Sequence, residues 1–297
     1  MSHTPRSILF APALVIGSMV SLTVGASLAK GLFPILGAAG TTFVRLAIGG
    51  LVLLALWRPW RTSLARLPWR QVVLYGVVLG VMNLTFYEAI ARLPIGIAIA
   101  LEFLGPLSVA FFLSRGRLDV LWASMALAGV ALLLPLTQVQ PGLDWAGIGF
   151  ALAAAVSWAT YILVGQKAGA SSHSGTVTAI GMTIACLTVA PFGTSAAWPV
   201  FSDLGLLPTA IAVGVLSSAI PYSLEMAALK QMDPKTFGIL LSLEPALGAL
   251  SAFVLLSEQI SLLQCLAIAC VVSASIGSTL TSRKKSQATL VSESHAP

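Results

Sequence analysis

The chain has 297 residues, of which 57% are hydrophobic and only 9% are charged. A soluble domain typically has about 25% charged residues, so the composition excludes an ordinary soluble protein. The formal net charge of +6 would suit a nucleic-acid-binding protein if it formed a patch. The basic residues instead lie in short segments between long uncharged runs, which is typical of membrane topology.

Ten apolar, largely uncharged runs follow one another between Ile8 and Thr281. Each is close to the roughly 20 residues that a helix needs to cross about 30 Å of hydrocarbon. The first run could resemble a cleaved signal peptide, but the nine further runs favour a membrane-spanning helix there too. We therefore expect an all-α membrane protein with ten transmembrane helices, over residues 8–29, 38–58, 71–91, 94–113, 119–136, 145–164, 176–195, 205–228, 236–256 and 261–281.

The basic residues between these runs are distributed very unequally. If the N-terminus is cytoplasmic, thirteen Lys and Arg residues fall on the cytoplasmic side and only Lys30 and Arg92 on the other, while Arg45 lies within a run. This is the positive-inside pattern. It predicts a multi-pass protein with both termini in the cytoplasm.

Two stretches in the two halves of the chain are alike. ARLPIGIAIALEFLGPLSVAF (residues 91–111) and KQMDPKTFGILLSLEPALGALSAF (residues 230–253) each contain a polar turn with Pro, an apolar run and a second Pro. As fourth helices of two five-helix units, they predict repeats over residues 8–136 and 145–281, followed by a disordered cytoplasmic tail over residues 282–297. An odd number of crossings inverts the second repeat, an arrangement that recurs in secondary transporters.

Glu102 and Glu244 lie in the middle of these paired helices. Ionisable residues at this depth are costly and are functional candidates by default. Pro106 and Pro245 have no N–H group and leave carbonyl groups free beside the two carboxylates. We expect helix breaks there that line a polar cavity, with the alternative that each Glu only bonds a neighbouring helix.

Three further ionisable residues lie nearer the ends of the predicted helices. Arg45 and Glu88 have opposite charges near the outer ends of adjacent helices, so they could pair. Glu225 lies near the inner end of the corresponding helix in the second half. We expect an outer gate at Arg45 and Glu88 and an inner gate at Glu225; the alternative is that these side chains extend to the membrane interface.

Several polar and aromatic side chains could bind an ammonium or carboxylate group within the cavity. The candidates are Asn83, Tyr87, Trp158, Tyr161 and Tyr222. The three His residues lie in termini or a loop, and the three Cys residues lack CxxC spacing. The sequence therefore predicts no metal site, no cofactor and no intramembrane enzyme of the HExxH or Ser/His type.

The stretches GASLAKGLFPILGAAG (residues 25–40), IPYSLEMAALKQMDPKTFGILLSLEPALGAL (residues 220–250) and LSEQIS (residues 256–261) resemble the drug/metabolite transporter superfamily with paired EamA domains. Within it, the chain is most similar to the bacterial threonine/homoserine exporters. The resemblance implies a proton-linked exporter of small amino acids in the bacterial inner membrane. One departure is Glu258 of LSEQIS, because the corresponding stretch of the first half reads LSRGRLD.

We therefore expect export of small polar amino acids by proton antiport, with a small amino acid, protons and the lipid bilayer as partners and no nucleic acid. Glu102 would carry the proton, and the proton and the substrate ammonium would compete for this carboxylate; Glu244 is the second candidate. The alternative is an exporter or exchanger of another small metabolite or of a hydrophobic cation. A passive channel is also compatible with the composition, but it would not require paired helix breaks.

Overall fold

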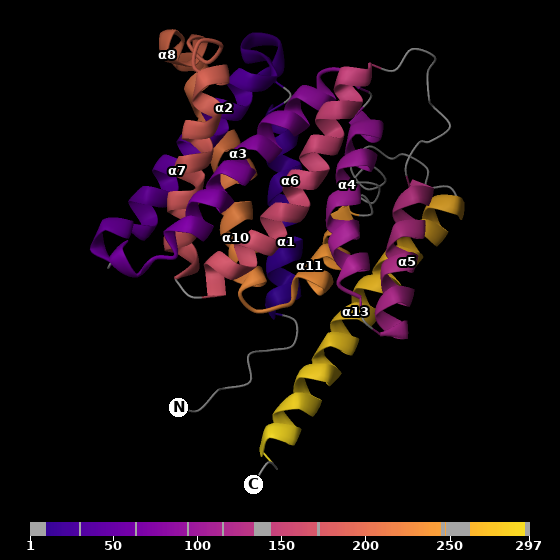
Figure 1. The fold of residues 1–297 in the computed structure, drawn as a ribbon. Coiled ribbons are helices and arrows are strands. Elements are labelled where there is room, and N and C mark those ends of the chain that lie inside the picture. The colour runs from indigo at the N-terminus through magenta and orange to yellow at the C-terminus, as the bar shows by residue number, and fades with distance from the viewer. Residues whose placement is uncertain are drawn as a thin grey trace. The chain divides into compact units, whose positions relative to one another are not determined.

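The structure, a computed structural model, describes residues 10–29, 31–62, 64–93, 95–114, 116–133, 144–170, 173–244, 247 and 262–294. Every regular element in these ranges is helical (Figure 1), which confirms the all-α class. The first half contains α1 (Phe10–Ala29), α2 (Phe33–Trp57), η1 (Pro59–Arg61), η2 (Leu64–Arg66), α3 (Trp69–Ile90), α4 (Ile95–Phe112) and α5 (Arg117–Leu133). The second half contains α6 (Trp145–Ala170), α7 (Ser174–Gly193), α8 (Pro199–Ser202), η4 (Leu204–Leu206), α9 (Leu207–Gly214), η5 (Val215–Ala219), α10 (Ile220–Leu229), α11 (Pro234–Leu241) and α13 (Leu262–Ser294).

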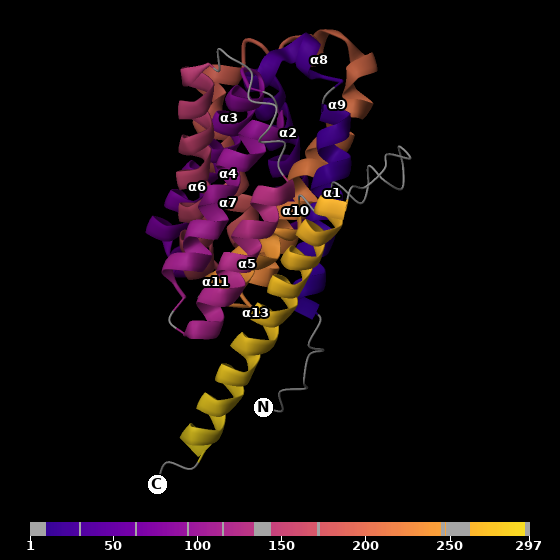
Figure 2. The same ribbon diagram turned by 90° about the vertical axis from the view of Figure 1, so that its right-hand side faces the viewer.

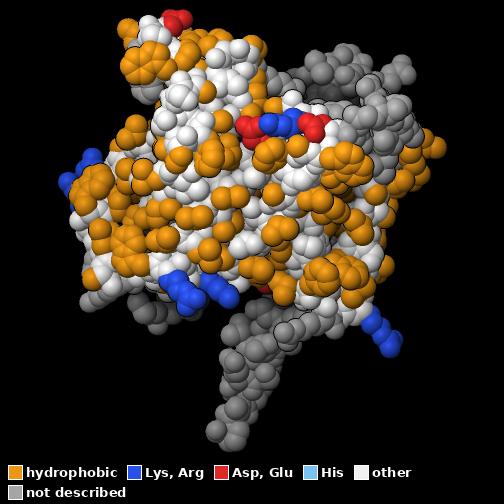
Figure 3. Space-filling model, turned by 45° about the horizontal axis from the view of Figure 1, so that its top comes forward, with side chains coloured by type: hydrophobic (Ala, Val, Ile, Leu, Met, Phe, Trp, Pro, Cys, Tyr) orange, Lys and Arg blue, Asp and Glu red, His pale blue; other side chains and the backbone are white. Residues whose placement is uncertain are grey.

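Five helical segments of the described chain are long and apolar enough to cross a membrane. They are Phe33–Arg61, Trp69–Ile90, Trp145–Ala170, Ser174–Gly193 and Leu204–Leu229, and shorter apolar helices occupy Phe10–Ala26, Ile97–Phe112 and Cys265–Thr281. Hydrophobic side chains are spread over the face shown in Figure 3, where charged side chains are few. Such a surface suits contact with lipid and not with water.

The chain forms two compact units, and neither coincides with one half of the sequence. Unit 1 contains residues 1–105 and 139–232, and unit 2 contains residues 106–138 and 233–297. Unit 1 therefore combines α1, α2 and α3 with α6, α7, α9 and α10, and unit 2 combines α5 with α11 and α13. The predicted halves 8–136 and 145–281 remain a hypothesis about a sequence repeat and do not describe separate compact bodies.

Small residues allow the helices of unit 1 to pack closely. α3 packs against α6 and α7, and α2 packs against α7. A Cβ atom added at Gly76 of α3 would lie 2.6 Å from Ile184 Cβ, and one at Gly80 would lie 2.8 Å from the Ala185 carbonyl oxygen. Glycines at this spacing let the backbones of α3 and α7 approach, as is common between membrane helices.

A π-helical turn, η5, precedes the helix that carries Glu225. It joins α9 to α10 within one continuous span, and α1 and α2 both pack against it. A Cβ atom at Gly25 of α1 would lie 2.6 Å from the Ser217 backbone nitrogen. π-turns inside helices occur frequently at functional sites, and this one lies directly before α10.

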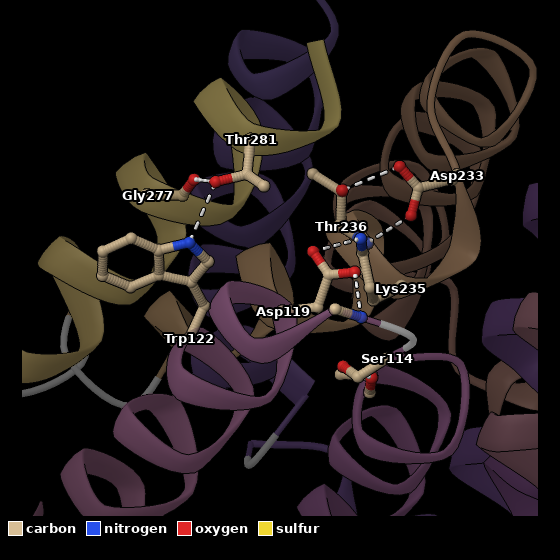
Figure 4. Close-up of polar contacts among 10 residues, drawn as sticks. Ser114, Asp119, Trp122, Asp233, Lys235, Thr236, Gly277 and Thr281 are labelled. Atoms are coloured by element: carbon tan, nitrogen blue, oxygen red, sulfur yellow. Dashed lines mark hydrogen bonds and ion pairs between the residues drawn. The ribbon is translucent and has the colours of Figure 1, made fainter. Parts of the chain in front are cut away.

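In unit 2, α5 and α13 lie side by side in both views (Figures 1 and 2). Trp122 of α5 covers Gly277 of α13, and its indole N–H donates to Thr281 Oγ1 at 3.0 Å (Figure 4). Lys235 of α11 forms a buried ion pair with Asp119 of α5, with Nζ 3.1 Å from Oδ1 (Figure 4). Lys235 is therefore a paired residue of the helix packing and not a solvated loop charge.

Two sequence predictions differ from the observed helices. α4 continues through Pro106, so no break interrupts it; neighbouring helices in membrane proteins can accommodate the missing N–H group of a proline. The predicted break at Pro245 lies outside the described residues. α13 extends to Ser294, whereas disorder was expected from residue 282, and its RKKSQATL segment contains no Pro or Gly that would end a helix.

Candidate functional site

Glu225 is the buried carboxylate at one end of a polar cluster in unit 1. Ser18 of α1 donates its hydroxyl to Glu225 Oε1 at 2.8 Å, and Tyr161 of α6 donates to Oε2 at 2.9 Å. Both donors are neutral, and no ion pair of the described residues includes Glu225. The carboxylate is thus oriented by hydrogen bonds from two helices while its charge has no cation in contact.

Aromatic rings surround this end of the cluster. Tyr75 of α3 stacks on Tyr161 with ring centroids 5.3 Å apart, and Tyr161 meets the edge of Tyr222 at 5.9 Å. Tyr75 is fully buried, and its hydroxyl has no hydrogen-bond partner within the described part of the chain. The rings keep water from the carboxylate, which strengthens its interaction with any bound charge.

Sequence reasoning did not identify Ser18 or Tyr75. The signal for Tyr75 was available, since Tyr75, Leu79, Asn83 and Tyr87 are spaced by four residues and share one buried face of α3. Ser18 is one of several small residues of α1, and nothing in its local sequence distinguishes it.

The middle of the cluster joins α3 to α10. Tyr222 donates its hydroxyl to Asn83 Oδ1 at 2.9 Å, and Asn83 Nδ2 donates to the Leu79 carbonyl at 2.7 Å. Because the third predicted helices of the two halves carry Asn83 and Tyr222, this hydrogen bond links corresponding parts of the sequence.

Arg45 lies at the other end of the cluster. It has twelve residues of α2 on either side and is 4% exposed. Arg45 Nη1 donates to the Tyr87 hydroxyl at 3.0 Å, and its guanidinium carbon lies 4.6 Å from the centre of the Tyr87 ring. The site thus contains a buried cation as well as a buried carboxylate.

These contacts form two connected groups, and the second begins at Tyr87, one turn of α3 beyond Asn83. We call the whole set the polar track: Ser18, Glu225, Tyr161, Tyr75, Tyr222 and Asn83 in the first group, and Tyr87 and Arg45 in the second. From Tyr75 to Tyr87 it follows α3 for twelve residues, or about 18 Å at 1.5 Å per residue. That length is more than half of the hydrocarbon thickness of a bilayer, about 30 Å.

Glu102 and Trp158 lie close to the track. Glu102 of α4 is 7% exposed and lies near enough to the Tyr222 hydroxyl for its charge to act there, in the sense opposite to that of Arg45. Trp158 of α6 contacts Phe103, the neighbour of Glu102, with ring centroids 5.2 Å apart. Eight of the residues proposed from the sequence therefore converge in unit 1, and Glu102 is one of two carboxylates among them.

The predicted contact between Arg45 and Glu88 is not formed in this structure. Glu88 instead forms an ion pair with Arg92, whose Nε also lies 3.9 Å from Asp144 Oδ2. Arg92 follows Glu88 by four residues, a spacing that brings two side chains together at the end of α3, whereas Arg45 is reached by Tyr87. The remaining candidate, Glu244, is half-buried in unit 2.

No group of three or more His, Cys, Asp or Glu side chains in the described ranges could hold a metal ion. The site offers hydroxyl, amide, carboxylate and guanidinium groups on a buried path. Such groups can hold a polar or zwitterionic molecule and can exchange protons.

Comparison with known proteins agrees with this geometry. The model of the EamA-like transporter family matches residues 145–280. The chain is 46% identical over 274 residues to the threonine/homoserine exporter RhtA of Escherichia coli (strain K12), which covers 92% of each chain. This chain belongs to the EamA-like transporter family.

A second relative and a solved structure agree with this comparison. The RhtA protein of Salmonella typhimurium (strain LT2) is 46% identical over 270 residues, covering 91% of each chain. A crystal structure of a protein that shares 23% identity has the same fold, with a TM-score of 0.73 over 92% of this chain and 98% of the other. The resemblance predicted from the sequence is thereby confirmed.

Proposed function

We propose that this EamA-family protein exports small polar amino acids of the threonine and homoserine type across the bacterial inner membrane. The relatives named as threonine/homoserine exporters support the substrate class. The observation that carries the proposal is the buried polar track. An ionisable side chain at the centre of a membrane helix costs about 2.5–3.5 kcal/mol, so retaining several such groups indicates that they serve a polar substrate.

The proposed topology has ten crossings, two inverted five-helix repeats and both termini in the cytoplasm. Two observations support it: the basic residues are distributed thirteen to two, and unit 1 combines the first three helices of the first half with the corresponding segments of the second. A topology reporter fused after Arg283 should be active in the cytoplasm. Activity in the periplasm would refute this orientation.

The proposed mechanism is proton antiport with alternating access. Glu102 carries the coupling proton, and Glu244, at the corresponding position of the second half, is the second candidate. A neutral, protonated carboxyl group crosses the apolar interior at a far lower cost than an anion, so protonation permits the empty carrier to reorient. The Glu88 and Arg92 pair and the Glu225 cluster lie toward opposite ends of α3, where gates would open in turn.

A counterflow assay tests the substrate class. Purified protein in proteoliposomes, loaded with one unlabelled amino acid at a time, should accumulate external labelled L-threonine when the lumen contains threonine or homoserine. An inward proton gradient should drive threonine in the opposite direction. Failure of all small polar amino acids to exchange, with protein correctly inserted, would refute amino-acid export.

A second candidate substrate, a hydrophobic cation, is favoured by one observation. The rings of Tyr75, Tyr161 and Tyr222 surround Glu225, and aromatic faces together with a carboxylate attract organic cations. In the same proteoliposomes, uptake of methyltriphenylphosphonium without threonine exchange would support this alternative. Threonine exchange that the cation does not inhibit would exclude it.

A further inference from the structure

Three buried polar atoms beside the polar track have no hydrogen-bond partner among the described residues. They are Thr41 Oγ1, Arg45 Nε and Ser218 Oγ. Thr41 and Ser218 are completely buried, and Arg45 nearly so. Buried polar atoms in native proteins almost always have a partner, so an unpartnered group in the interior suggests a ligand.

Two of these atoms, Thr41 Oγ1 and Arg45 Nε, belong to one face of α2, and Ser218 packs against that face further along the helix. Thr41 and Arg45 are four residues apart and therefore lie on the same face of α2, and Gly49 continues that face by one more turn. A Cβ atom at Gly49 would lie 2.8 Å from Ser218 Cβ. The face that bears Thr41 and Arg45 therefore meets η5, just before Tyr222 on α10.

The electrostatics of Arg45 indicate the charge of the ligand. A guanidinium has five N–H donors, and the contact with the Tyr87 hydroxyl uses one of them. The ion pairs of the described chain join Arg92 with Glu88 and Asp144, and Lys235 with Asp119; none includes Arg45. A buried cation without a carboxylate in contact attracts an anionic ligand strongly.

We propose that Arg45 and Thr41 bind the carboxylate of the transported amino acid; this inference rests on the proposed function. Nε–H and a free Nη–H of Arg45 supply the parallel pair of donors that a carboxylate accepts, and the Thr41 hydroxyl supplies a third. Tyr87 holds the guanidinium in place from α3. Glu102, a buried carboxylate whose charge opposes that of Arg45 at the Tyr222 hydroxyl, would receive the substrate ammonium.

The position of Arg45 separates this role from that of a gate. A gate residue lies near the mouth of the pathway, whereas Arg45 lies midway along α2, with twelve residues of the element on either side and a kink at Gly37, eight residues before it. Transporters hold their substrates near the middle of the membrane. Glu88 pairs with Arg92 and not with Arg45. The guanidinium of Arg45 can therefore accept a substrate carboxylate without first breaking an ion pair with Glu88.

Three probes separate the groups of the substrate: L-threonine carries both charges, L-threoninol lacks the carboxylate, and 3-hydroxybutyrate lacks the ammonium. Binding of each to the purified full-length protein is measured by titration calorimetry. In Arg45→Gln, L-threonine and 3-hydroxybutyrate should bind about 10- to 100-fold more weakly, the range for a lost hydrogen bond to a charged group. Binding of L-threoninol should change less than about two-fold. Arg45→Lys should bind the carboxylate probes with an affinity between those of the wild type and Arg45→Gln, because it keeps the positive charge but loses the paired N–H donors.

Thr41→Val gives an independent test, because it should weaken binding without lowering stability. Removing an unpartnered buried hydroxyl should leave the thermal midpoint unchanged or higher, while carboxylate probes should bind about 3- to 10-fold more weakly. Thr42→Val is the matched control, because the Thr42 hydroxyl already donates to the Ala38 carbonyl within α2 at 2.9 Å. Thr42→Val should bind all three probes as tightly as the wild-type protein does, even if its stability changes.

The outcomes separate this inference from the proposed function. If the wild-type protein exchanges L-threonine but Arg45→Gln keeps the wild-type ratio of threonine to threoninol affinity, the carboxylate site is refuted and export stands. If the wild-type protein binds 3-hydroxybutyrate but not L-threonine, and Arg45→Gln loses that binding, amino-acid export is refuted and the site stands. Binding of none of the probes refutes both. If Arg45→Gln does not fold, unchanged ratios in Arg45→Lys and Thr41→Val refute the site.

Discussion

Replacing Glu225 distinguishes the contribution of its carboxylate to stability from its contribution to transport. In Glu225→Ala, the hydroxyls of Ser18 and Tyr161 lose the acceptor that they now share. Each unsatisfied buried hydroxyl costs about 1–3 kcal/mol, and the one lost methylene group adds roughly 0.8 kcal/mol. We expect the free energy of unfolding to fall by about 3–7 kcal/mol.

Glu225→Gln should behave differently, because the amide keeps the shape and a hydroxyl can rotate to accept from it. Its free energy of unfolding should stay within about 1 kcal/mol of the wild type, while efflux driven by a proton gradient should be lost if the charge at this gate is used. Unfolding in mixed detergent micelles and transport in proteoliposomes measure the two effects.

Tyr161→Phe serves as a control, since it removes one donor and keeps the ring stacked on Tyr75. It should destabilise the protein by about 0.5–1.5 kcal/mol. If Glu225→Ala is as stable as Glu225→Gln, the two hydroxyl contacts contribute nothing to folding and the reasoning is refuted.

Three further changes test other parts of the protein. Glu102→Gln should insert normally but fail to accumulate L-threonine against its gradient in vesicles with a pH gradient; unchanged accumulation with unchanged pH dependence would assign the coupling role elsewhere. Gly25→Ala places a Cβ atom 2.6 Å from the backbone of η5, so its unfolding free energy should fall by about 1–3 kcal/mol, and an unchanged value would mean that η5 moves freely. Asp119→Asn leaves the buried Lys235 charge without its partner and should cost about 3–5 kcal/mol; the double variant Asp119→Leu/Lys235→Met should recover most of that loss in the same unfolding assay.

The helices could be predicted because the physics that produces them is local. An uncharged run of about 20 residues must satisfy its backbone internally in hydrocarbon, and a helix does so. The observed α3 and α7, Trp69–Ile90 and Ser174–Gly193, differ from the predicted 71–91 and 176–195 by one or two residues. Several polar residues of the site were predictable for the same reason, because an ionisable group at membrane depth is exceptional.

The pairing of those residues could not be predicted, because it depends on contacts between helices. Two cations could pair with Glu88: Arg92, four residues further along the sequence, and Arg45 on α2. The sequence alone does not show which of the two ion pairs forms. Glu225 illustrates the same limit, since its partner Ser18 is 207 residues distant. The division into compact units also follows from packing: the boundary between them falls between residues 105 and 106, although α4 itself continues through Pro106.

The two ends of the polar track differ in a way that favours transport over a purely structural role. A structural ion pair would bring Arg45 and Glu225 into contact, where opposite charges attract by about 4 kcal/mol at 4 Å and an effective dielectric constant of 20. Instead, Arg45 contacts Tyr87, Glu225 contacts Ser18 and Tyr161, and the Asn83–Tyr222 hydrogen bond lies between them along the track. Each charge is therefore oriented by neutral donors or rings and keeps its capacity to attract a mobile charge. A carrier that must bind and release both a zwitterion and a proton requires charges held in this way, because a carboxylate and a guanidinium that neutralise each other leave nothing for the substrate.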